Sequence, residues 1–100
     1  MNLQNQTLNS LASLAMDLKR ASLGFSRGSN LMAQKFLEEA IRRKQEISPD
    51  QIDSYIKKIL AKLPDIFGGK DDSKKAEDAL MYGVLLQNYV VTHSSPQRRL

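Results

Sequence analysis

The side chains that most enzymes use for nucleophilic or acid–base chemistry are scarce in this chain. It contains no cysteine and one histidine, His93. A catalytic serine or threonine needs a neighbouring base, which is usually histidine. His93 falls at the edge of the polar C-terminal tail, just after the last expected helix, where a histidine is typically a helix-end residue. We therefore expect a protein that is not an enzyme.

Metal and phosphate sites are not favoured by the spacing of the remaining polar residues. The acidic cluster within residues 71–78 lacks the ordered ligands and central glycine of a calcium loop. A single histidine cannot supply the two Glu-x-x-His motifs of a di-iron bundle. The Gly-Gly-Lys run at residues 68–70 lacks the glycine spacing and the Lys-Ser/Thr ending of a phosphate loop. We expect no cofactor and no metal, and we interpret the acids as helix N-terminal residues favoured by the helix dipole.

Basic side chains on two expected helices suit an anionic ligand. The net charge is +4, and clustered cations neutralise phosphates. Two arginines have a glutamate one turn earlier, in the pairs Glu38–Arg42 and Glu39–Arg43. The later helix offers few residues suited to reading base edges. Nucleic-acid binding is therefore the alternative function, through the candidate contacts Arg42, Arg43, Lys44, Lys57, Lys58 and Lys62.

The most apolar stretch of the chain is ALMYGVLLQNYVV at residues 79–91. A helix that is apolar on nearly all sides must be enclosed on nearly all sides. It is either the central helix of a small bundle or half of an interface with a second copy. We assign the side that carries Leu80, Val84 and Val91 to the core. The other side has no evident cover within the chain, and tyrosine is enriched at interfaces; it gives the candidate interface Tyr82, Leu85, Leu86 and Tyr89.

Two glycines in helical segments have different expected roles. Gly83 interrupts the apolar stretch at a cost of about 1 kcal/mol relative to alanine. Close approach of another helix at Gly83 would explain why it is tolerated. Gly24, followed by the turn-forming residues 27–30, is expected to end the first helix.

Four segments have the three-and-four spacing of apolar residues that is typical of amphipathic helices. In the third, Ser48 supplies an N-cap, Pro49 the first helical position and Gln51 the capping-box partner, and Pro64 ends it. No strand is predicted. The expected helices lie near residues 3–24, 30–46, 49–63 and 72–92.

Short connections between these segments favour antiparallel neighbours. The sequence therefore predicts an all-α four-helix bundle with antiparallel up-down topology. The tight joint at Ile47 and Ser48 leaves an orthogonal bundle as the alternative. We expect residues 1–92 to form a single helical domain and residues 93–100 to form a flexible, polar and basic C-terminal tail.

Composition places the chain among globular proteins, with 41% hydrophobic and 26% charged residues. The first positive charges follow the N-terminal leucines, so no signal peptide is predicted. The longest apolar run is too short and interrupted to span a bilayer, and the lack of cysteine suits a reducing compartment. We expect a cytoplasmic protein with no membrane partner.

These observations predict a small, non-enzymatic helical module for protein–protein interaction or regulation. We expect a homo-oligomer, specifically a dimer, that forms through the apolar fourth helix and binds another protein. Nucleic-acid binding through the basic surface of the second and third helices is the alternative.

Overall fold

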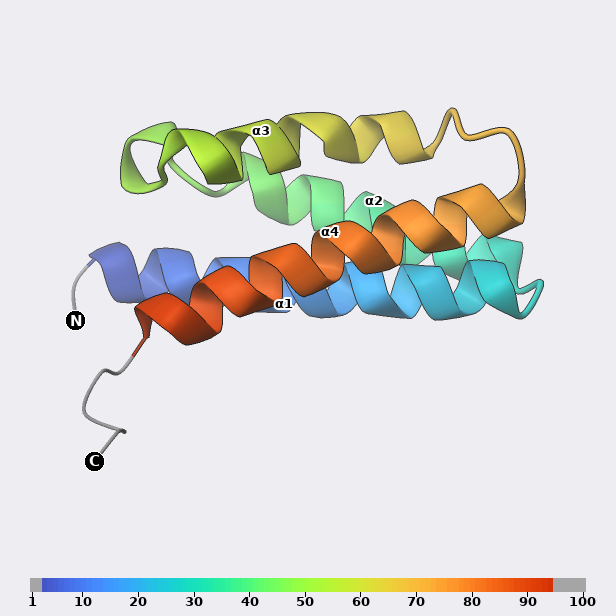
Figure 1. Cartoon of the computed structure of the whole chain (residues 1–100), viewed down its shortest axis with the longest axis horizontal. Helices are drawn as coiled ribbons and strands as arrows, with labels where there is room; N and C mark the ends of the chain where they lie inside the picture. Colours follow the sequence, from blue (N-terminus) through green and yellow to red (C-terminus); the bar gives the residue numbers. More distant parts are fainter. Residues whose placement is uncertain (1–2, 95–100) are drawn as a thin grey trace.

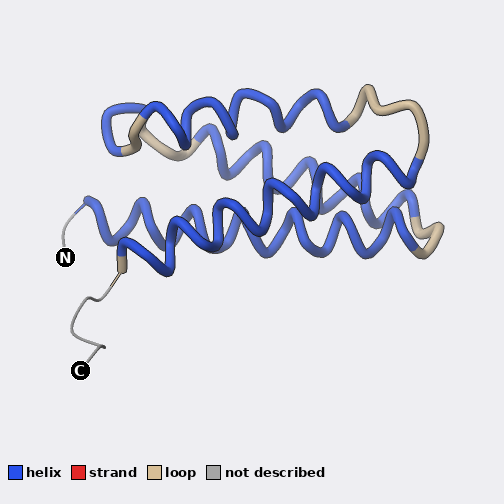
Figure 2. The backbone as a smooth tube through the Cα atoms, in the orientation of Figure 1, coloured by secondary structure: helices blue, strands red, loops and turns tan. Residues whose placement is uncertain are grey.

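A computed structural model describes residues 3–94 of the chain. Its α-helices are α1 (Leu3–Ser26), α2 (Asn30–Gln45), α3 (Ser54–Lys62) and α4 (Asp72–His93). Two short 3₁₀ helices, η1 (Pro49–Gln51) and η2 (Leu63–Ile66), flank α3. Figure 2 shows loops only at the helix ends, and the described part of the chain contains no strand. The all-α prediction is confirmed.

The helices form an antiparallel four-helix bundle about 41 Å long. Consecutive helices run in opposite directions along the long axis, as Figure 1 shows. The up-down topology is therefore confirmed over the orthogonal alternative. α1 packs most closely on both α2 and α4, and α3 lies on the far side of these two helices from α1. The central helix is thus α1, so the alternative in which residues 79–91 form the central helix is not the one that the structure shows.

The apolar stripe of α1 forms the middle of the core. Its positions recur every three or four residues, so they lie on one side of the helix. The stripes of α2 and α3 close the core from the opposite side. The fully buried large side chains of the bundle are Leu11, Leu14, Leu18, Leu37, Ile56, Leu63, Ile66 and Leu86.

Gly28, and not Gly24, ends α1. Gly28 has a positive φ of 79°, a conformation that glycine adopts without steric cost. Its amide donates to the Phe25 carbonyl at 3.3 Å, and the Ser29 amide donates to the Gly24 carbonyl at 2.8 Å. Gly24 lies within the helix, where a Cβ atom would come 2.8 Å from the Cβ atom of Ala33. Gly24 therefore permits the close approach of α1 and α2.

The start of α3 also differs from the prediction. Residues 49–51 form η1, and Ile52 is extended, with φ −131° and ψ 154°. The Asp53 carboxylate then accepts a hydrogen bond from the Ile56 amide at 3.1 Å, so Asp53 is the N-cap in place of Ser48. The capping-box pattern at Ser48 does not start α3, because the extended Ile52 interrupts the helix. Residues 95–100 of the expected tail lie outside the described residues, and His93 belongs to α4.

Candidate functional site: an apolar face on α1 and α4

The core side of α4 is formed by small residues and one leucine. Ala76, Ala79, Gly83 and Leu86 are buried, whereas the stripe assigned to the core from the sequence is exposed, with Leu80 at 48% and Val91 at 56%. The assignment of Leu80, Val84 and Val91 to the core is therefore wrong. Small side chains let two helix backbones approach closely, so the alanine–glycine line faces α1 and the bulkier residues point outward.

Gly83 lies at a close contact between α1 and α4. A Cβ atom at this position would come 3.2 Å from the Ala15 carbonyl oxygen and 3.4 Å from the Leu18 Cβ atom. About two turns earlier on α4, the Ser22 hydroxyl donates to the Ala76 carbonyl at 2.7 Å and fixes the register of the two helices. The expected close approach of another helix at Gly83 is confirmed.

The candidate interface predicted from the sequence lies mostly on the side of α4 that faces α3. Leu86 is fully buried, and Tyr82, Leu85 and Tyr89 are partly buried against the core. The side that was expected to lack a cover within the chain is partly covered, and Asp53 and Tyr55 at the start of α3 line a depression together with Leu85 and Tyr89. Leu86 is consequently not available to a partner of the folded chain.

Tyr89 of α4 interacts with Asp53 at the start of α3. Burial raises the pKa of the Tyr89 phenol above its ordinary value, and the charge of Asp53 and a hydrogen bond to that carboxylate raise the pKa further. Asp53 is also the N-cap of α3. His93 stacks on the Tyr89 ring at 3.9 Å, and its Nδ1 atom lies 2.9 Å from the Tyr89 carbonyl oxygen. The single histidine is therefore engaged at the helix end.

The raised pKa of Tyr89 predicts a loss of stability in alkali. The folded state favours the neutral phenol, so its contribution is fully present below the ordinary pKa of about 10 and is lost as the pH rises through the higher folded value. Subtracting the ultraviolet titration of Tyr89→Phe from that of the wild type isolates this ionisation, and we expect a midpoint above pH 10.

The Asp53→Asn variant is the control for this titration, because asparagine also caps helices well but carries no charge. It should lower the midpoint of Tyr89 without unfolding α3. If the titration midpoint of Tyr89 lay at the ordinary value for tyrosine and did not change in Asp53→Asn, the interaction between Tyr89 and Asp53 would be contradicted.

Two exposed apolar stripes lie side by side on α1 and α4. Residues 12, 16, 19 and 23 of α1 share one side of the helix, and residues 80, 84, 87 and 91 of α4 have the same spacing. A hydrogen bond from Lys19 to Gln87 joins the two stripes. The large apolar side chains of the two stripes are all exposed to solvent. We call this surface the two-stripe face; it consists of Met16, Leu23, Leu80, Val84 and Val91.

Both arginines that were expected to contact nucleic acid form ion pairs within the chain. Arg42 pairs with Glu39 and not with the expected Glu38, whereas Arg43 contacts Glu39 at 3.6 Å as expected. Lys44 and Lys57 line the same shallow depression between α2 and α3. Lys58 and Lys62 are exposed on α3. Binding of nucleic acid through this surface stays a prediction.

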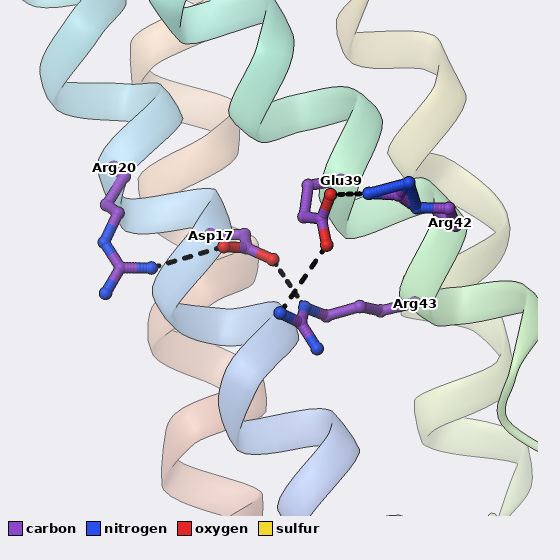
Figure 3. A network of polar contacts seen from close by, with 5 residues as sticks. All are labelled: Asp17, Arg20, Glu39, Arg42 and Arg43. Carbon is purple, nitrogen blue, oxygen red and sulfur yellow. Dashed lines mark hydrogen bonds and ion pairs between the residues drawn. The ribbon is translucent and has the colours of Figure 1, made fainter.

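A buried carboxylate that the sequence analysis missed links α1 to α2. The Asp17 side chain is only 4% exposed and lies between two guanidinium groups, as Figure 3 shows. Its oxygens are 2.8 Å from the Nε atom of Arg43 and 3.3 Å from the Nη1 atom of Arg20. The available signal was the position of Asp17 three residues after Leu14, at the edge of the apolar stripe, because a buried charge requires a partner.

Within residues 3–94 the structure groups no three metal-ligating side chains that could hold an ion. None of the described helices is long and apolar enough to cross a membrane. Comparison with known proteins found no match among family models, curated proteins or solved structures. The two-stripe face is thus the surface from which a function is best argued.

Proposed function

We propose that this protein is a non-enzymatic helical module that forms a homodimer through the two-stripe face. The observation that carries the proposal is the pair of adjacent apolar stripes on α1 and α4, exposed in the single chain. Contiguous exposed apolar patches of this kind mark interaction sites. A chain of 100 residues also buries a small share of its surface alone, so association adds to its stability.

A second copy of the chain is the occupant that fits this face. The two stripes run antiparallel with identical spacing, so a copy turned by 180° about an axis in the plane of the face sets apolar stripe against apolar stripe. Such a self-complementary arrangement is what a two-fold interface requires. The polar pair at its centre, Lys19 with Gln87, is already hydrogen-bonded within one chain. The hydrogen-bonding groups of this pair therefore already meet within one chain.

The proposed function includes a cellular compartment for the protein. The chain contains no cysteine, which suits a reducing interior such as the cytoplasm. We accordingly place the dimer in the cytoplasm.

Sedimentation equilibrium of two matched variants tests the dimer. Leu80 on the two-stripe face and Tyr55 on α3 are both 48% exposed, so Leu80→Glu and Tyr55→Glu each place one charge on a half-exposed helix position. We expect the wild type and Tyr55→Glu to be dimers at micromolar concentration. In Leu80→Glu the dissociation constant should rise about tenfold or more, equivalent to about 1.4 kcal/mol.

Circular dichroism of both variants shows whether each remains folded. A monomeric wild type at high micromolar concentration would refute self-association. An equal rise of the dissociation constant in both variants would instead indicate that the dimer interface does not lie on the two-stripe face.

A further inference from the structure

A second exposed surface lies between α1 and α2. Gly24 and Ala33 bring the two helix backbones together at its floor, and Leu23, Met32 and Phe36 form its walls. The resulting depression has a volume of about 180 Å³. We call it the α1–α2 groove. Its volume is below the roughly 300–1,000 Å³ typical of small-molecule pockets, but it offers room for a single apolar side chain of a partner.

The walls of the α1–α2 groove are apolar and open to solvent. Leu23 and Met32 are about half exposed, and Leu31 beside them is the most exposed large hydrophobic residue of the described chain. Methionine adapts its shape to different partners and is frequent at binding surfaces. A groove of this kind between two helices typically receives the apolar side of a third helix.

Positive charge surrounds the groove. The Arg20 guanidinium lies 5.6 Å from the centre of the Phe36 ring, and its contact with Asp17 holds it there. Arg27 lines the same depression, and Lys35 lines the adjoining one with Leu31. None of the described residues that line either depression is acidic. The partner side chains that surround the apolar anchor should therefore be acidic.

The N-terminus of α2 adds to this positive potential. The Ser29 side chain makes no capping hydrogen bond to α2, and Ser29 lines both depressions. The first amides of a helix carry a partial positive charge that favours carboxylates. The nearby Asp72 accepts a hydrogen bond at 2.8 Å from Asn30, which lines the adjoining depression. Asp72 itself lines neither depression.

From these contacts we infer that the α1–α2 groove binds an acidic amphipathic helix of another protein. An apolar side chain of that helix enters between Leu23 and Met32. Its carboxylates face Arg20, Arg27 and the N-terminus of α2. The groove is distinct from the surface of the proposed dimer except for Leu23, which borders both, so the variants that test the groove leave Leu23 unchanged.

Fluorescence anisotropy with two labelled synthetic peptides tests this inference. One is an amphipathic helical peptide of Leu, Ala and Glu, and the other has Lys in place of every Glu. We expect the acidic peptide to bind about tenfold or more tightly than the basic one at low salt, with an affinity that falls as salt rises. The double variant Arg27→Glu/Met32→Gln should weaken acidic-peptide binding about tenfold.

The control variant Lys58→Glu/Tyr55→Gln makes the same two kinds of change on α3, away from the groove. It should bind the acidic peptide within about twofold of the wild type. Equal losses in the two double variants would overturn the inference, because they would indicate a general charge effect. Equal affinity for the two peptides would overturn it as well.

Two further measurements distinguish the groove from the dimer surface and from a membrane contact. Leu80→Glu, which should disrupt the dimer, is expected to leave peptide binding unchanged; loss of binding in that variant would overturn the groove as the site. Vesicles containing phosphatidylserine are not expected to bind. If the vesicles bound through Arg27 and Met32 while the acidic peptide did not, the groove would be a membrane contact and the inference would be wrong.

Discussion

Leu86→Ala is expected to destabilise the fold by about 2–5 kcal/mol, whereas Leu80→Ala should cost no more than about 1 kcal/mol. Both changes replace leucine with alanine within α4, so the change in helix propensity is the same. They differ in burial: Leu86 is fully buried and Leu80 is about half exposed. Urea unfolding followed by circular dichroism measures both free energies.

This comparison separates the sequence-based assignment of α4 from the observed one, since the apolar pattern of the sequence placed Leu80 in the core. Unfolding at several protein concentrations distinguishes loss of folding from loss of association, because only the latter depends on concentration. A larger loss for Leu80→Ala than for Leu86→Ala at every concentration would contradict the observed orientation of α4.

Arg43→Met is expected to destabilise the fold by about 1–3 kcal/mol, because it leaves the buried Asp17 carboxylate without its closest partner. Arg20 remains at 3.3 Å from that carboxylate, but its side chain is half exposed. Asp17→Asn should cost less than Arg43→Met. In that variant the Arg43 guanidinium, which is 35% exposed, keeps water and Glu39 as partners.

Arg42→Met is the matched control for this prediction, since it makes the same substitution at the neighbouring position. The Arg42 side chain is 63% exposed and pairs with Glu39 at the surface, and exposed pairs contribute about 0–1 kcal/mol. Thermal unfolding of the three single variants and of Asp17→Asn/Arg43→Met completes a double-mutant cycle. Equal losses in Arg42→Met and Arg43→Met would show that the Asp17 contact contributes nothing.

The central position of α1 connects the two proposed surfaces. Its inward side supplies Leu11, Leu14 and Leu18 to the core. Its outward side contributes to the two-stripe face toward α4 and to the α1–α2 groove toward α2. A module that dimerises through one surface would present two copies of the other, which increases the avidity for a partner with two acidic helices.

The apolar periodicity of the sequence was sufficient to predict most of the helices. In the first helix that periodicity is made by Leu8, Leu11, Leu14, Ala15 and Leu18, and all five are buried, because one continuous apolar side leaves a helix only one stable orientation. The prediction was wrong at the start of α3, where two capping signals compete. Ser48 and Asp53 both precede helical residues, and only the extended Ile52 between them decides in favour of Asp53.

The candidate site was less predictable than the fold. α4 is apolar on several sides, so its sequence permits more than one orientation, and hydrophobicity favoured the larger side chains for the core. The buried pair of Asp17 and Arg43 joins residues 26 positions apart. Local spacing carries no information about such a contact, and it predicted only the pair of Arg43 with Glu39 one turn away.

The sequence by itself determined that this chain forms four helices joined by short turns, because three-and-four spacing and turn residues act within each segment, but it left an up-down and an orthogonal bundle as alternatives. Only the tertiary structure decided which helix is central, which side of α4 is buried and which arginine meets Asp17. Those outcomes depend on how closely two backbones can approach. Gly83 on α4 and Gly24 on α1 permit contacts with Ala15 and Ala33, and such contacts exist only once the helices have packed together.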